Sequence, residues 1–263
     1  LVVDRLHKFS LDELNQLFKL TVGSQTKFVG FSTTFFANSD VDKNDDGSTP
    51  TYGPMRHAFM PQGQEFENQF IKLVREYNPD IKIVVGGGSA LLFEQNRNVD
   101  YAFVGYSEAS IVNFMNHLTK GTELTNTVRN LWGVNIVDDR TAKSYDFVNS
   151  TMTWLDTDVI NQKVLPFEIA RGCIFKCKFC NYPLLGKKKG TYIRDMAQVR
   201  DEIIKVWEEN GTESFYMTDD TFNDDNDKME SFHKLFTSLP FKPKFAAFLR
   251  LDLIDRFPHQ ADL

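Results

Sequence analysis

Short runs of apolar, mostly β-branched residues alternate with amphipathic segments along the first half of the chain. Such alternation predicts strands and helices in turn, which is typical of a doubly wound α/β domain with a parallel sheet. Ser10 and Glu13 have the spacing of a capping box at the start of a helix, and Asn78-Pro79 ends another. The expected strands are residues 27–32, 81–85, 101–104 and 131–137, and the expected helices after the first are residues 64–77 and 107–118.

The alternation stops in residues 151–164, which we interpret as a linker, and restarts at residue 165. The expected strands are then residues 165–170, 214–218 and 245–249, and the expected helices are residues 195–210, 225–239 and a last one from residue 254 onward. Three βα units are too few to close a barrel. The sequence therefore predicts two α/β domains, residues 1–150 and residues 165–263.

Composition narrows the class of protein. The chain has 263 residues, 41% of them hydrophobic and 25% charged, as in soluble globular proteins with room for two cores. No apolar run approaches the roughly 20 residues that span a bilayer. A formal charge of -6 gives no general attraction to nucleic acid or to an anionic membrane. Three clustered cysteines do not make a secreted disulfide framework, so we expect a cytoplasmic protein.

All three cysteines, Cys173, Cys177 and Cys180, lie within eight residues in the pattern C-x3-C-x2-C. A structural zinc site normally has four ligands, and no histidine stands close enough in sequence to be the fourth. Three thiolates on a 4Fe-4S cluster would leave one iron open to a further ligand. A zinc site with a distant ligand, or a group of buried thiols, is the alternative.

The cysteine spacing, with the aromatic Phe179 before the last cysteine, resembles the radical S-adenosylmethionine (SAM) superfamily. Four further segments, residues 83–88, 99–108, 215–222 and 248–252, resemble the cobalamin-binding subfamily of these enzymes. The resemblance implies a Rossmann-like cobalamin-binding domain in residues 1–150, followed by the N-terminal part of a radical SAM (β/α) barrel in residues 165–263. It also implies a piece of a longer protein, truncated at both ends.

In that family the open iron of the cluster binds the amino and carboxylate groups of SAM, and reduction cleaves SAM to a 5'-deoxyadenosyl radical. The implied cofactors are therefore a 4Fe-4S cluster, SAM and cobalamin. The implied reaction is methylation or rearrangement of a small-molecule substrate that the sequence does not identify. An electron donor such as flavodoxin or ferredoxin is the implied partner.

The resemblance also implies residues that bind the cofactors. Phe179, Asp219, Asp220 and Arg250 correspond to positions near SAM, where Arg250 would pair with its carboxylate. The cobalamin would lie against two strand-end turns, Ser32, Thr33 and Thr34 in the first and Gly86, Gly87 and Gly88 in the second. Each group also has a plainer interpretation. Phe179 would pack under the loop, the two aspartates would cap a turn, and Arg250 would be solvated. The turns at residues 32–34 and 86–88 would be ordinary strand-to-helix connections.

Two rival functions stay open. The first is a radical SAM enzyme whose N-terminal domain has lost cobalamin. The second is a non-catalytic fragment in which an iron–sulfur cluster serves only structure or electron transfer. Corrin absorbance separates the leading hypothesis from the first rival, and reductive cleavage of SAM separates an enzyme from the second.

Overall fold

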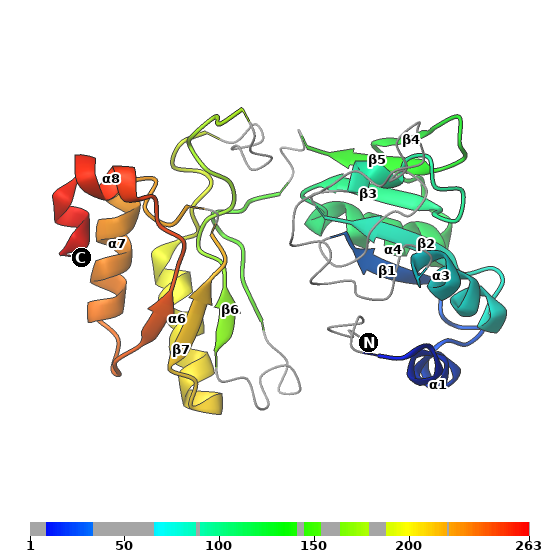
Figure 1. Cartoon of the computed structure of the whole chain (residues 1–263), viewed down its shortest axis with the longest axis horizontal. Helices are drawn as coiled ribbons and strands as arrows, with labels where there is room; N and C mark the ends of the chain where they lie inside the picture. Colours follow the sequence, from blue (N-terminus) through cyan, green and yellow to red (C-terminus); the bar gives the residue numbers. More distant parts are fainter. Residues whose placement is uncertain are drawn as a thin grey trace. The chain divides into compact units, whose positions relative to one another are not determined.

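The computed structural model describes residues 9–33, 66–87, 90–140, 145–153, 164–178, 188–219 and 221–262. The chain divides into two compact units, Leu1–Ser144 and Tyr145–Leu263, and each has its own sheet (Figure 1). Most of the predicted linker, residues 154–163, lies outside the described residues. No helix within the described ranges is long and apolar enough to cross a membrane.

The first unit is built on a sheet with the strand order β1-β2-β3-β5-β4. β1, β2, β3 and β5 run parallel, and β4 pairs antiparallel with β5 at the edge. In chain order the described elements are α1 (Leu11–Thr21), β1 (Phe28–Ser32), α3 (Phe66–Tyr77), β2 (Lys82–Gly86), the 3-10 turn η2 (Ala90–Phe93), β3 (Tyr101–Gly105), α4 (Glu108–Lys120), β4 (Thr127–Arg129) and β5 (Asn135–Asp139).

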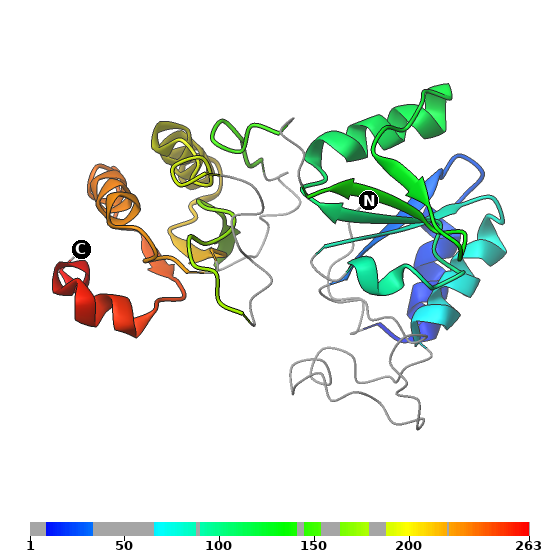
Figure 2. The ribbon, with the colours of Figure 1, turned by 90° about the horizontal axis from the view of Figure 1, so that it is seen from above.

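Helices cover both faces of this sheet. Ile83 and Val85 of β2 join a core cluster with residues of α1 and α3, whereas Val84 packs in a second cluster with Phe114 of α4. Figure 2 shows α4 on one side of the sheet and α1 and α3 on the other. Because successive strand residues point to opposite faces, an uninterrupted apolar run marks a strand that is buried on both sides. The predicted α/β class with a parallel sheet is confirmed.

The predicted strand 131–137 is wrong at its start. The structure places a tight turn at residues 130–133 between β4 and β5, and β4 itself was not predicted. The side chain of Asn130 accepts hydrogen bonds from the backbone N–H groups of Trp132 and Val134, and Gly133 has a φ of 87°. Asparagine favours turns because its side chain bonds to nearby backbone N–H groups, and glycine favours them because it adopts positive φ. The apolar residues Leu131 and Trp132 between them led to the incorrect prediction of a strand.

The second unit has the sheet order β6-β7-β8, with all strands parallel. Its described elements are β6 (Leu165–Phe167), α6 (Met196–Asn210), β7 (Ser214–Met217), α7 (Asn226–Thr237), β8 (Lys244–Ala246), α8 (Leu251–Arg256) and the 3-10 turn η3 (Pro258–Ala261). β6 ends before residue 170 and β8 before residue 249, so both are shorter than predicted. α8 begins three residues earlier than residue 254, the predicted start.

Helices of the second unit cover one face of its sheet. Phe167 and Phe215 pack against α6 and α7 in a single core cluster, and Figure 2 shows both helices on the same side of the strands. The register pairs Pro166 with Tyr216 and Tyr216 with Ala246, so these three residues share the opposite face. All three are exposed.

Candidate metal centre and cofactor sites

The cysteine motif lies in a loop that leaves the carboxyl end of β6. Ala170 forms an antiparallel bridge with Ile193. On either side of it, the N–H of Arg171 donates to the carbonyl of Tyr192 at 2.9 Å, and the N–H of Arg194 donates to the carbonyl of Ile169 at 2.8 Å. These bonds join the two ends of the loop. Residues 171–192, which we call the cysteine loop, therefore start and finish at the same sheet edge, where parallel α/β folds bind ligands.

Two of the three predicted metal ligands lie in described residues. Cys173 is 6% exposed and Cys177 is partly exposed, and neither is in a disulfide. Burial raises the pKa of Cys173, so a positively charged metal is the kind of partner that would stabilise its thiolate. Cys180 and Phe179 lie outside the described residues, which among themselves contain no group of three Cys, His, Asp or Glu able to hold a metal. The two described thiols fit a soft-metal or iron–sulfur donor set.

Asp219 holds the strand end from which the cysteine loop begins. Its Oδ1 accepts hydrogen bonds from the backbone N–H groups of Ile169 at 3.0 Å and Ala170 at 3.1 Å. The residue is 2% exposed, and burial raises the pKa of its carboxyl to about 6, although Lys228 and the two N–H groups oppose this rise. Contact with SAM stays a prediction for Asp219, as it does for Asp220, which lies outside the described residues.

Arg250 lies against the cysteine loop. Its guanidinium carbon is 4.1 Å from the centroid of the Phe175 ring, midway between the first two cysteines in sequence. This is a cation–π contact. Its guanidinium also pairs with Asp252, with 2.6 Å between Nη2 and Oδ2. The structure therefore brings the predicted SAM-carboxylate residue to the loop that carries the predicted cluster ligands.

The backbone of Arg250 is fixed by a buried residue that the sequence did not single out. Asn223 accepts from the N–H of Arg250 at 2.8 Å and donates to its carbonyl at 3.0 Å. Gln260 accepts from the same amide nitrogen at 3.0 Å. Asn223 therefore fixes the position of the chain after β8 relative to the loop after β7. The only local sign of this was a polar residue in a predicted turn.

The second residue missed by the sequence reasoning is Asp224. Its Oδ2 accepts from the N–H of Ile174 at 3.2 Å and from the hydroxyl of Tyr192 at 3.0 Å. Its Oδ1 is 2.6 Å from the ammonium of Lys228, and both side chains are buried. In sequence, Asp224 followed by Asp225 at a helix start suggests capping, and Asp225 does cap α7.

In the first unit, predicted cobalamin-site residues meet where β1 and β2 end. The N–H of Thr33 donates to the carbonyl of Gly86 at 2.7 Å, and Ser32 is in register with Gly86. Gly87 has a φ of 102°, and a Cβ there would lie 3.0 Å from Oγ1 of Thr33. The backbone conformation at residue 87 and its close approach to Thr33 therefore favour glycine whether or not a ligand binds there. Thr34 and Gly88 lie outside the described residues.

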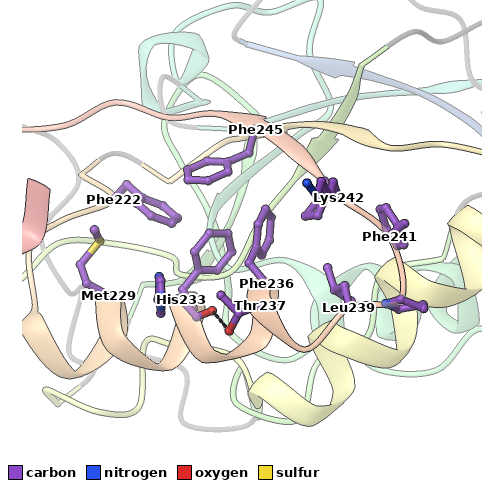
Figure 3. Close-up of a pocket in the computed structure, with 12 residues that line it drawn as sticks. Phe222, Met229, His233, Phe236, Thr237, Leu239, Phe241, Lys242 and Phe245 are labelled. Carbon is purple, nitrogen blue, oxygen red and sulfur yellow. Dashed lines mark hydrogen bonds between the residues drawn. The ribbon is translucent and has the colours of Figure 1, made fainter. Parts of the chain in front are cut away.

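A separate apolar cavity of about 640 Å³ lies beside α7 (Figure 3). Side chains from α7, the segment before β8 and Phe245 of β8 line it, most of them aromatic or aliphatic. The close-up shows the rings of Phe222, Phe236 and Phe245 gathered above the helix. None of the residues predicted to bind a cofactor lines this cavity.

No protein-family model matches the chain, and no curated protein sequence matches it significantly. Among solved structures, the chain is similar to the cobalamin-dependent S-adenosylmethionine radical enzyme OxsB, solved with aqua-cobalamin and S-adenosylmethionine bound. The TM-score is 0.58 at 17% sequence identity, and the match covers 88% of this chain and 31% of OxsB. At this identity the likeness shows a shared fold, and this chain spans about a third of the length of OxsB.

Proposed function

We propose that this chain is part of a radical SAM enzyme and that Cys173, Cys177 and Cys180 hold a 4Fe-4S cluster. The observation that carries the proposal is the cysteine loop at the carboxyl end of β6, with Arg250, from the connection between β8 and α8, stacked on it. A fold shared with a SAM radical enzyme supports the same function. The three-cysteine spacing explains the absence of a fourth ligand near the motif, because one iron must stay open.

Each protein group then has a defined role. The thiolates would bind iron, and the guanidinium of Arg250 would offer its planar donors to the SAM carboxylate. Phe179 and Asp220 would contact the adenosyl part, and Asp219 would support the chain at the end of β6. When bound and reduced, a cluster of this kind supplies the electron that cleaves SAM. The electron comes from a donor such as flavodoxin or ferredoxin, in the reducing environment of the cytoplasm.

We also propose that the first unit binds cobalamin at the edge formed by Ser32, Thr33, Thr34, Gly86, Gly87 and Gly88. In a doubly wound sheet, ligands lie outside the carboxyl ends of the strands, and this edge carries small and hydroxyl side chains. The structure of OxsB contains aqua-cobalamin, which favours cobalamin over other ligands here. The reaction would be methylation or rearrangement of a small molecule.

The cluster is tested by anaerobic reconstitution of the full chain with iron and sulfide. We expect about four irons per chain and an electron paramagnetic resonance (EPR) spectrum of the reduced protein that changes when SAM is added. Replacing Cys177 with Ala should abolish iron retention, whereas Arg250→Lys should retain iron and weaken the response to SAM. Stoichiometric zinc without iron uptake would contradict the proposal.

Cobalamin binding is tested by titrating the chain with hydroxocobalamin and following the corrin absorbance. We expect the spectrum to shift on binding and Thr33→Val, which keeps the shape but removes the hydroxyl, to weaken that binding. Gly87 is a poor probe because its φ of 102° makes any substitution strained. If the wild-type chain leaves the corrin spectrum unchanged while its cluster forms, the first rival is correct and this unit is vestigial.

A further inference from the structure

Both ends of the cysteine loop are attached to one carboxylate oxygen, Oδ2 of Asp224. At the start of the loop, the N–H of Ile174, next to Cys173, donates to this oxygen at 3.2 Å. At its end, the hydroxyl of Tyr192 donates to the same atom at 3.0 Å. The loop leaves from β6, whereas Asp224 belongs to the connection between β7 and α7. The cysteine loop is therefore tied to a second βα unit.

Lys228 holds the other oxygen of Asp224. Its ammonium lies 2.6 Å from Oδ1 of Asp224 and 3.7 Å from Oδ2 of Asp219, and it donates to the carbonyl of Thr221 at 3.0 Å. The side chains of Lys228 and Asp224 are 1% and 0% exposed. Burying this pair costs desolvation free energy, and an apolar pair of similar size is often at least as stable. We therefore attribute this buried ion pair to the precise placement of the Asp224 carboxylate and not to a gain in folding stability.

We infer that Asp224 is a positioning residue that fixes the backbone beside Cys173 relative to Tyr192, in an arrangement that favours cluster binding, an inference that rests on the proposed function. The carboxylate orients the backbone next to Cys173 and joins it to the segment that closes the loop. Lys228 balances its charge from the first turn of α7, and Tyr192, which is fully buried, has its hydroxyl directed at the same carboxylate.

Two double variants separate the hydrogen-bond acceptor from the charge pair. Single substitutions would leave a buried charge unpaired and could prevent folding. Asp224→Asn with Lys228→Met removes both charges but keeps an amide oxygen for Ile174 and Tyr192. Asp224→Leu with Lys228→Met removes the same charges and the acceptor, in a side chain of similar shape. The two proteins differ only in the side chain at position 224, and only the Asn side chain offers an acceptor.

The first measurement is backbone amide hydrogen exchange at Ile174 in the metal-free full chain. We expect exchange about tenfold or more faster in the Leu variant than in the wild type, and little change in the Asn variant, because only in the Leu variant does the partly buried N–H of Ile174 lose its acceptor. Equal exchange rates at Ile174 in the two double variants would overturn the inference. This measurement needs no cluster, so it decides whether Asp224 holds the loop even if no iron binds.

The second measurement is made on reconstituted protein. We expect the Leu variant to retain less than half of the iron of the Asn variant, with an altered EPR spectrum of the reduced cluster, while circular dichroism shows both folded. Equal iron content and identical spectra would also overturn the inference. A wild-type chain that takes up no iron would contradict the proposed function and with it the role in cluster binding.

Discussion

The two sheets of this protein bury their strands differently. In β2 of the first unit, neighbouring residues Val84 and Val85 are 5% and 0% exposed, because helices pack on both faces. In β7 of the second unit, Phe215 is 1% exposed and its neighbour Tyr216 is 37% exposed. The second sheet thus has one apolar core, on the side of α6 and α7, and an opposite face on which Pro166, Tyr216 and Ala246 are exposed.

Buried charge differs in the same way. Among the described residues of the first unit, Asp139 is the one buried charged side chain, whereas the second unit buries Arg194, Asp219, Asp224, Asp225 and Lys228. Four of the five belong to the loop after β7 and the start of α7, next to the cysteine loop. Departures from an apolar interior concentrate at functional sites. The comparison therefore supports the proposed cluster site in the second unit.

The largest expected effect tests the difference between the two sheets. Phe215→Ala should lower the free energy of unfolding of the second unit by about 3 to 5 kcal/mol, because a large buried ring leaves a cavity. Tyr216→Ala should cost only about 1 kcal/mol, since part of that ring is exposed. In β2, Val84→Ala and Val85→Ala should cost similar amounts, about 2 kcal/mol each.

Urea unfolding followed by hydrogen exchange of peptides from each unit measures these free energies separately. A loss of stability for Tyr216→Ala as large as that for Phe215→Ala would show that the face of the sheet carrying Tyr216 is covered in solution. It would contradict the conclusion that the second sheet is buried on one face only.

A second prediction concerns the backbone at the carboxyl edge of the first sheet. Gly105, at the end of β3, has a φ of 96°, and a Cβ there would lie 2.5 Å from the backbone nitrogen of Arg140. Gly105→Ala should therefore destabilise the first unit by about 3 kcal/mol. Gly30→Ala is the matched control, because its Cβ would meet only the ring of Phe28 at 3.8 Å. Thermal unfolding should show a clear decrease in Tm for Gly105→Ala and little change for Gly30→Ala.

A third prediction uses the raised pKa of Asp219. Burial raises this pKa from 3.8 to about 6, so between these values the folded state binds more protons than the unfolded state. The contribution of Asp219 to stability therefore decreases as the pH rises from about 4 to about 6, by about 2 to 3 kcal/mol in total. Asp219→Asn keeps an oxygen acceptor for Ile169 and Ala170 but cannot titrate.

The difference in unfolding free energy between wild type and Asp219→Asn should change over this pH range in favour of the variant and become constant above it. A difference that does not depend on pH would show that the carboxyl has an ordinary pKa. The first unit, measured in the same samples, provides an internal control.

The smallest effects test whether the two units unfold independently. Ser10 forms a reciprocal capping box with Glu13 at α1, and Asp195 accepts from two N–H groups at the start of α6. Ser10→Ala and Asp195→Ala should each cost about 1 kcal/mol. Hydrogen exchange should detect each loss only in the unit that carries the substitution. A loss that spreads to both units would mean that they unfold together.

Local signals in the sequence predicted much of the fold. Alternating apolar runs located β1, β2, β3, β6 and β7, the capping box of Ser10 and Glu13 located the start of α1, and the amphipathic pattern of residues 195–210 located α6. Errors arose where local preferences were weak. The strand predicted for residues 131–137 includes most of the turn at residues 130–133 because Leu131 and Trp132 are apolar, and β8 is shorter than the apolar run that predicted it.

The sequence by itself supplied the basis for the proposed chemistry of the candidate site, because the cysteine spacing is a local property of the chain. Only the tertiary structure brought Arg250 onto Phe175 and placed Asp224 under both ends of the cysteine loop. Asp224 lies 50 residues from Ile174 in sequence. Parallel strands align their carboxyl ends at one edge, so residues from separate βα units converge there. That convergence depends on strand register and long-range packing, which local sequence patterns do not encode.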